Sequence, residues 1–235
     1  GLVFASDLEK FAGIPYRTIQ ADMVGDRTAA SRNLGGPAVV AMVNAAQLID
    51  TGDTDVEFYG VRGDDDTGDE LVGILNRTPL SFDNYDVRTG RTPKTDVYSD
   101  PDYDDGRGER TFVNELGVAA EYRVTDLPDS FFDAEIAVFG GTALLPAFHA
   151  ELHVPVERAH NRGALTVVNT VYDFKNEQKD HRSTWPLGRT ETTLANTDIL
   201  IVDAEESRRI SGESDPNRGA TRFLEAGVSA VLITR

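Results

Sequence analysis

The stretch Gly35-Gly36-Pro37-Ala38-Val39-Val40-Ala41-Met42-Val43-Asn44-Ala45-Ala46-Gln47-Leu48, followed by Gly60-Val61-Arg62-Gly63-Asp64-Asp65-Asp66-Thr67-Gly68, decides the fold class. Two glycines open an apolar run with helical spacing, and a second glycine cluster closes a β-rich run. Because glycine has no Cβ, the backbone can turn sharply at both places. Corners between a strand and a helix are where α/β sheets bind ligands. These two stretches therefore predict an α/β ligand-binding fold.

Short apolar runs alternate with helical patterns along most of the chain. The expected strands are 56–59, 135–139, 165–169, 199–202 and 230–234. The expected helices are 38–49, 69–75, 147–162, 205–210 and 217–226. Continuous apolar strands are typical of a parallel sheet that helices cover on both faces. The alternation predicts a doubly wound α/β fold.

One segment, residues 81–122, breaks this rhythm. It has no helical pattern, but β-favouring residues gather at 95–98 and 110–113, on either side of the acidic turn 99–106. Two short strands joined by a polar turn predict a hairpin. The pattern alone leaves open whether it forms a small separate sheet or the edge of the main sheet.

Length and charge limit the class of protein. The chain has 235 residues, no cysteine and a formal net charge of -17. We expect a single domain over residues 1–235, without disulfides, in the cytoplasm. The negative charge disfavours binding to nucleic acid or to anionic membranes, because both would repel the chain. An acidic surface also suits a protein adapted to high salt, or simply one encoded by a GC-rich genome.

The two glycine-rich stretches resemble the N-terminal signature of the ribokinase (PfkB) family of carbohydrate kinases. The second motif is complete as Gly60, Gly63, Asp65 and Gly68. This resemblance implies a ribokinase-like doubly wound, mostly parallel sheet flanked by helices, with a small β lid. It places the lid elements within about residues 8–34 and 81–122, and it implies a homodimer formed through the lid.

The resemblance also implies an activity. Members of this family transfer the γ-phosphoryl group of ATP, with Mg²⁺, to a hydroxyl of a sugar or a related small molecule. A nucleoside kinase of the same fold is one alternative. A noncatalytic sugar-binding or regulatory relative is another.

Several residues would contact the substrate if the resemblance holds. Residues 1–7 resemble the end of the family's first strand, where Asp7 would be the Asp that commonly accepts hydrogen bonds from sugar hydroxyls; it could equally cap a turn. Gly35 and Gly36 stand at the hinge between the lid and the main domain. Val40 occupies a position where the family usually has Asn, so Asn44, one turn further, is the candidate replacement.

Three more candidates come from the hairpin and the next strand. Lys94 lies just before the first hairpin strand and could contact an anionic sugar group or a phosphate, or remain a solvated loop cation. Asn114 ends the second hairpin strand, whose following loop borders the substrate in the family. Asn169 directly follows a buried strand, at the edge where ligands collect.

Two acids are candidates for organising Mg²⁺. Asp203 and Glu206 follow the strand 199–202 and resemble the family's Asn-x-x-Glu motif, with Asp in place of Asn. Carboxylate oxygens suit a hard cation. The same pair could form a capping box at the start of a helix. By contrast, we expect Asp64, Asp65 and Asp66 to form a structural corner, although three acids invite a metal interpretation.

The family's most specific motif, Gly-Ala-Gly-Asp, does not occur between residues 1 and 235. It supplies the anion hole and the catalytic base. We therefore expect both to lie beyond Arg235 in an active kinase, while a noncatalytic relative would do without them. His149 and His153 are spaced by four residues but lack the Glu of a His-Glu-x-x-His motif, so we expect surface or interface positions rather than zinc ligands.

Overall fold

The computed structural model describes residues 2–49 and 54–234. Its main helices are α1 (Ala5–Ala12), α2 (Tyr16–Val24), α3 (Pro37–Ile49), α4 (Asp66–Leu75), α5 (Tyr103–Gly106), α6 (Pro146–His149), α7 (His153–Asn161), α8 (Phe174–Lys179), α9 (Thr190–Ala195), α10 (Ala204–Ser211) and α11 (Pro216–Glu225). Short 3-10 helices lie at Gly117–Glu121, Val124–Asp126, Asp129–Asp133 and Thr142–Leu144.

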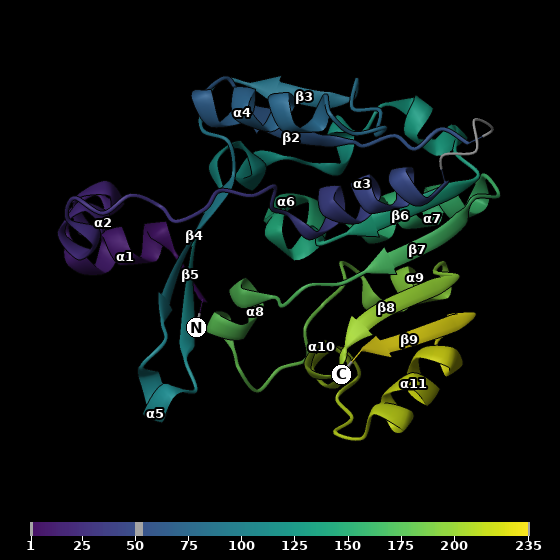
Figure 1. Cartoon of the computed structure of the whole chain (residues 1–235). Coiled ribbons are helices and arrows are strands. Elements are labelled where there is room, and N and C mark those ends of the chain that lie inside the picture. Colours follow the sequence, from purple (N-terminus) through teal and green to yellow (C-terminus); the bar gives the residue numbers. More distant parts are fainter. Residues whose placement is uncertain (1, 50–53, 235) are drawn as a thin grey trace.

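A parallel sheet forms the body of the molecule (Figure 1). Its strands are β6 (Ile136–Gly140), β7 (Leu165–Asn169), β8 (Ile199–Asp203) and β9 (Ala230–Thr234), and they are hydrogen-bonded in that order. Helices α7, α10, α11 and α3 pack against these strands. Phe139, Val168, Leu200 and Val202 are at most 3% exposed, as expected for strands covered on both faces.

A second layer lies beside α3. Strand β2 (Gly60–Gly63) pairs in parallel with β3 (Tyr85–Arg88), and α4 follows β2. Val39, Val43 and Ala46 of α3 pack with Leu75 of α4 and with Leu80 in a separate apolar cluster. Figure 1 shows α3 between this layer and β6. The first glycine pair therefore leads into a helix that joins two layers of the fold.

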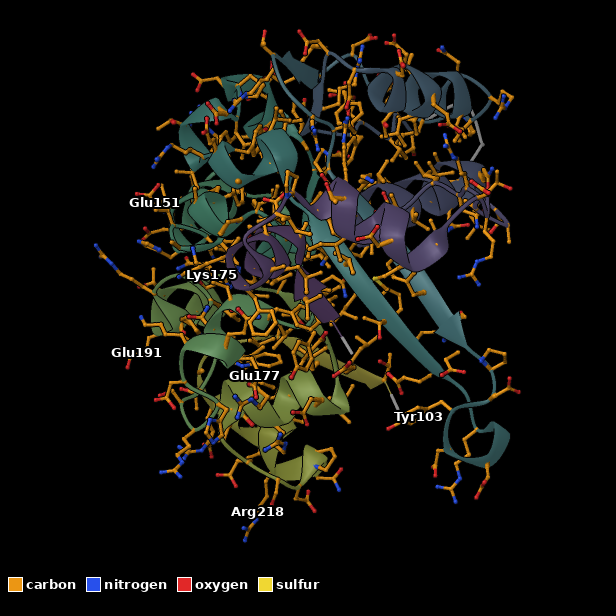
Figure 2. The ribbon with its side chains drawn as sticks, turned by 90° about the vertical axis from the view of Figure 1, so that its left-hand side faces the viewer. Tyr103, Glu151, Lys175, Glu177, Glu191 and Arg218 are labelled. Carbon is orange, nitrogen blue, oxygen red and sulfur yellow. The ribbon has the colours of Figure 1, made fainter. Side chains whose placement is uncertain are left out.

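The predicted hairpin forms a small sheet of its own, hereafter the lid sheet. Strand β4 (Lys94–Asp100) pairs antiparallel with β5 (Glu109–Glu115), and β1 (Leu2–Phe4) pairs in parallel with β5. Helices α1 and α2 cover one face of it through Ala5 and Tyr16. The tip of the hairpin, marked by Tyr103, projects away from the body (Figure 2). Of the two alternatives, the separate sheet is correct.

The predicted α/β class is confirmed, and so are the strands 165–169 and 230–234. The strand expected at 56–59 is wrong. Glu57 makes only an isolated bridge to Ser81, and the ladder between β2 and β3 starts at Gly60. The reason is a turn, closed by the hydrogen bond from Tyr85 N–H to Phe82 O, that separates Ser81 from β3.

Two further predictions need correction. The lid elements expected within 8–34 are not strands, since all of 8–34 is described and its regular structure is helical, in α1 and α2. The single helix expected over 147–162 is two helices, α6 and α7. Pro155 has no N–H to bond back to Glu151, so it occupies the first turn of a new helix.

None of the helices in the described ranges is long and apolar enough to cross a membrane.

Candidate active site at the carboxyl edge of the parallel sheet

The carboxyl ends of three neighbouring strands bring polar residues to one edge of the sheet. The strand register places Gly140 opposite Asn169, and Asn169 opposite Ile201. Asp203 ends the next strand. Asn169 is partly exposed, and its amide donates a long hydrogen bond of 3.4 Å to the carbonyl of Ile201. In open α/β sheets ligands bind outside this edge, so it is the candidate active site.

The first glycine corner lies against this edge. Gly140 and Gly141 meet the start of α3 so closely that a Cβ on Gly141 would lie 2.5 Å from Cγ of Pro37. Gly141 has a φ of 61°, in the left-handed region that favours glycine. Gly35 and Gly36 themselves are exposed, and Gly36 has a φ of 94°. Small residues on both sides thus let the start of α3 approach the end of β6.

Asp203 and Glu206 form a capping box at the start of α10. The Glu206 amide donates to the Asp203 carboxylate at 2.7 Å, and the Asp203 amide donates to Glu206 Oε2 at 2.9 Å. The hydroxyl of Thr170, just after β7, also donates to Glu206 Oε2, at 2.6 Å. The capping box, which was the structural alternative to a cation site for this pair, is therefore present. The bond from Thr170 to Glu206 links the ends of β7 and β8.

Burial raises the pKa of the Glu206 carboxyl, and the nearby Asp203 charge adds to this, although the bonds from Thr170 and Asp203 oppose it. Asp203 is exposed while Glu206 is 6% exposed. A desolvated carboxylate without a cationic partner is unfavourable, and a nearby cation would relieve it. Among the described residues there is no group of three His, Asp or Glu that could hold a metal ion directly. The pair fits a cation bound through water.

The second glycine corner is a packed structural corner, as expected. Asp65 caps α4 by accepting from Gly68 N–H at 3.0 Å, and it also accepts from Thr92 N–H at 3.1 Å and from the Thr92 hydroxyl. A Cβ on Gly63 would lie 2.2 Å from the carbonyl oxygen of Gly90. Asp65 thereby ties β2 and α4 to the segment that leads into the lid sheet.

Lys94 does not offer a free cation. Its ammonium contacts Asp96 Oδ2 at 3.0 Å and Glu115 Oε1 at 2.9 Å. Burial alone would lower the pKa of Lys94, but these two carboxylates outweigh it and raise the pKa. Asn114, on β5, is 6% exposed and accepts a hydrogen bond from the Thr95 hydroxyl at 2.5 Å. The two carboxylates neutralise the Lys94 ammonium, whereas the Asn114 amide keeps its capacity to donate.

Two further candidates lie away from the carboxyl edge. Asp7 was expected at the end of the first strand, but β1 ends at Phe4 and α1 begins at Ala5, so Asp7 lies exposed in the first turn of α1. Asn44 is exposed on α3, and its amide donates to the carbonyl of Val40 at 2.9 Å. The structure brings together Gly35, Gly36, Asn169, Asp203 and Glu206, but not these two.

His149 was expected at a surface or interface position and is instead buried within the fold. Its Nε2 lies 2.8 Å from the carbonyl of Pro186 and 3.5 Å from Asp173, while Nδ1 lies 2.9 Å from the Thr142 hydroxyl. Because a carbonyl only accepts, Nε2 carries the proton, and in the neutral ring Nδ1 accepts from Thr142. A single histidine thereby joins the loops after β6 and β7.

A cavity of about 10 Å³ lies beside this histidine, lined among others by Thr142, Thr170, Asp173 and Trp185. Burial would raise the pKa of Asp173, but hydrogen bonds from His149 and Asn176 lower it. No local sequence pattern predicts this cluster of residues around His149, because they are spread over residues 142–186. Only Trp185, a lone tryptophan in a polar loop, has a pattern that marks it as a packing anchor.

The segment between β7 and α9 is fixed by a second contact. Arg209 of α10 is 7% exposed and pairs with Glu177 of α8, and it donates to the carbonyl of His181 at 2.7 Å. Trp185 also donates to Glu177, at 3.0 Å. Figure 2 shows α8, with Lys175 and Glu177, between the N-terminal helices and the C-terminal elements. This segment is therefore held firmly along the carboxyl edge.

Solved structures with this fold include several sugar and nucleoside kinases. Fructokinase from Xylella fastidiosa is 21% identical, with a TM-score of 0.64 over 88% of this chain and 65% of its own. A second structure of that fructokinase contains bound ATP. Adenosine kinase from Sinorhizobium meliloti is 17% identical, with a TM-score of 0.70 over 100% of this chain and 65% of its own. Ribokinase from Thermotoga maritima is 18% identical, with a TM-score of 0.62 over 88% of this chain and 62% of its own.

The chain thus spans about 65% of the length of the fructokinase that it matches. No curated protein matches it. The model of the pfkB family of carbohydrate kinases matches residues 10–235, which include both glycine corners and the whole carboxyl edge. The chain therefore belongs to the pfkB family of carbohydrate kinases.

Proposed function

We propose that this protein is an ATP-dependent kinase that phosphorylates a hydroxyl of a sugar or a related small molecule. The observation that carries the proposal is the position of the Gly35–Gly36 corner, whose helix begins against Gly140 and Gly141 at the carboxyl end of β6. A substrate there would lie beside Asn169 and close to the acids that follow β8. Membership of the family and the ATP-bound fructokinase structure support this assignment.

The acid pair suits the phosphate end of such a site. Asp203 and Glu206 would hold Mg²⁺ through water, and the bound ion would neutralise charge on the ATP phosphates. Glu206 is kept in place for this by Thr170 and by the Asp203 amide. Phosphoryl transfer needs mainly positioning and charge neutralisation, and this rigid edge provides the positioning.

The lid sheet suits the sugar end. It lies across from the carboxyl edge, and it would exclude water when it closes over a substrate, so that the sugar hydroxyl is the only acceptor. Asn114 is the lid residue that we propose as a substrate contact. Lys94 is not proposed as one, because its ammonium is already paired with two carboxylates.

A test is ADP release from ATP and Mg²⁺ by the full-length protein, measured over a panel of sugars, polyols and nucleosides. Turnover dependent on one sugar or polyol supports the proposal. Turnover on a nucleoside alone would assign the protein to the nucleoside kinases instead. Tight sugar binding without any ADP release would favour the noncatalytic sugar-binding relative.

A further inference from the structure

We infer that Lys175 and Lys179, on one side of α8, form a cationic entry surface that attracts the polyphosphate of ATP to the carboxyl edge of the sheet. We call this surface the lysine face. The inference rests on the proposed function and adds to it a nucleotide-attracting surface that neither the glycine motifs nor the acid pair contains. It follows from where an acidic chain keeps its unpaired cations.

Residues 174–189 reverse the charge balance of the chain. The whole chain has 40 Asp and Glu against 23 Lys and Arg, so its overall field repels anions. The segment 174–189 has two acids, Glu177 and Asp180, against four cations: Lys175, Lys179, Arg182 and Arg189. The chain has only four lysines, and two of them lie within the six residues of α8. A locally positive stretch in so acidic a protein points to an anionic ligand.

The acids of this segment have partners within the fold, whereas its cations are open to solvent. Glu177 pairs with Arg209 and accepts a hydrogen bond from Trp185 at 3.0 Å. Asp180 accepts from the Arg182 N–H at 2.9 Å. The side chains of the four cations are exposed, and none of them has an ion-pair or hydrogen-bond partner in the described part of the chain. Their positive charge is therefore available to a ligand from outside.

The geometry of α8 sets the direction of the lysine face. Lys175 and Lys179 are four residues apart, so they lie on the same side of the helix. Glu177 is two residues from each, rotated by about 160–200° around the helix axis, and therefore lies on the opposite side. Because Glu177 meets Arg209 of α10, the two lysines point away from α10. Figure 2 shows Lys175 on the side of the N-terminal helices and Glu177 on the side of the C-terminal elements.

Several contacts hold the lysine face next to the carboxyl edge. Only four residues separate the end of β7 from α8, and the first of them, Thr170, is bound to Glu206. The last of them, Asp173, caps α8 by accepting from the Asn176 N–H at 3.1 Å, and it lies 3.5 Å from His149. Because these contacts fix α8, its two lysine charges stay close to the acid pair at the same edge.

The acid pair makes such charges useful for nucleotide binding. The Mg²⁺ complex of ATP is still an anion, so Asp203, Glu206 and the acidic surface oppose its approach. The lysine face offsets this repulsion beside the edge. A lysine ammonium is a compact charge on a flexible stem, which suits attraction of a mobile anion better than a rigid bidentate contact. The attraction decays over about 10 Å at 0.1 M salt, so it should fade as the ionic strength rises.

Titration calorimetry of the full-length protein tests this with ligands of increasing charge: adenosine, ADP and ATP, the two nucleotides with Mg²⁺. The test variant combines Lys175→Gln with Lys179→Gln. The control combines Lys10→Gln with Arg218→Gln, which removes the same two charges from exposed side chains of α1 and α11 that form no ion pair with any described residue. At low salt we expect the test variant to bind ATP about threefold to tenfold more weakly, ADP less so and adenosine unchanged, with the difference lost at about 0.5 M salt. The control should bind all three ligands like the unaltered protein, and thermal unfolding would confirm that both variants are folded.

Equal weakening of ATP binding in the two double variants would overturn the inference, because the effect would then reflect net charge alone. An effect that is the same for adenosine and ATP, or that salt does not reduce, would overturn it as well. Loss of gluconate or fructose 6-phosphate binding in the test variant, with ATP binding kept, would mean that the lysine face recognises the acceptor instead, and the inference would fail. In each of these cases sugar-dependent ADP release would leave the kinase assignment intact. Absence of ATP binding by the unaltered protein would overturn the proposed function, and this inference with it.

Discussion

The hydroxyl of Thr170 and the carboxylate of Glu206 are joined by a 2.6 Å hydrogen bond that ties the loop after β7 to the helix after β8. This bond holds a buried acid at the edge where open α/β sheets bind their ligands. Burial raises the pKa of that acid, so its charged form destabilises the folded protein until a cation approaches. A group that is costly to ionise and yet positioned at a ligand edge is a candidate for function.

Replacement of Glu206 should separate stability from binding. In the folded protein the pKa of Glu206 is raised above its ordinary value of 4.5. The contribution of Glu206 to the free energy of unfolding is therefore fully present below pH 4.5, and it is lost as the pH rises through the raised pKa. Glu206→Gln keeps an oxygen that accepts from Thr170 and Asp203. We expect it to be at least as stable as the unaltered protein at about pH 8 in a chelator, and to bind Mg²⁺-ATP about tenfold more weakly. Thermal unfolding and calorimetry measure the two effects; a large loss of stability at that pH would show a purely structural role.

Asp65 should stabilise the second glycine corner strongly. Asp65→Ala removes the cap of α4 and two bonds to Thr92, and we expect a loss of about 2–3 kcal/mol in the free energy of unfolding. Burial would raise the pKa of Asp65, but the bonds from Thr92 and Gly68 lower it, so its contribution is present at neutral pH and is lost as the pH falls below about 4. Urea unfolding at neutral and acidic pH measures this. Asp66→Ala, at the exposed neighbour, is the control and should cost less than about 1 kcal/mol; an equal loss in both variants would contradict the assigned role.

Gly141 should be needed for the approach of α3 to β6. Gly141→Ala places a methyl group about where Pro37 lies and requires a φ of 61° from alanine. We expect a loss of about 1–3 kcal/mol in stability and weaker sugar binding, because the first glycine corner shifts. The control is Gly73→Ala, in the middle of α4 with open space around it, which should stabilise the protein by up to about 1 kcal/mol. Chemical unfolding of the two variants gives the comparison, and a neutral Gly141→Ala would show that the contact is not tight.

His149 should anchor the loop that runs along the carboxyl edge. His149→Phe fills a similar space but leaves the Pro186 carbonyl, the Thr142 hydroxyl and Asp173 without their partner. We expect a loss of about 2–4 kcal/mol in stability. Hydrogen exchange should rise in residues 170–189. His181→Gln, at an exposed side chain, should change neither quantity. Unchanged exchange in that segment would mean that Arg209 alone holds it.

Local patterns predict the parts of the fold that local physics determines. Strands 165–169 and 230–234 are correct to the residue because continuous apolar runs bounded by polar residues leave few alternatives. The Asp203–Glu206 spacing indicates both a capping box and a cation site, and the capping box is present. The two glycine motifs indicate the family by themselves, and the family match confirms it.

Tertiary contacts decide the rest. Lys94 is a plausible anion contact by composition, but pairing across the hairpin places it beside Glu115 and Asp96. Asp7 was expected to end an apolar strand, but β1 ends at Phe4 and Asp7 lies in the first turn of α1. His149 meets Pro186 and Asp173 only through folding. Contacts between residues far apart in the sequence leave no local pattern by which they could be foreseen.

The most direct measurement is phosphorus NMR of the full-length protein with ATP, Mg²⁺ and the sugar or polyol that binds most tightly. The account predicts a sugar phosphate signal that grows as the γ-phosphate signal of ATP falls, and that forms much more slowly with Glu206→Gln. Release of inorganic phosphate alone, or persistence of ATP while the sugar is bound, would contradict it.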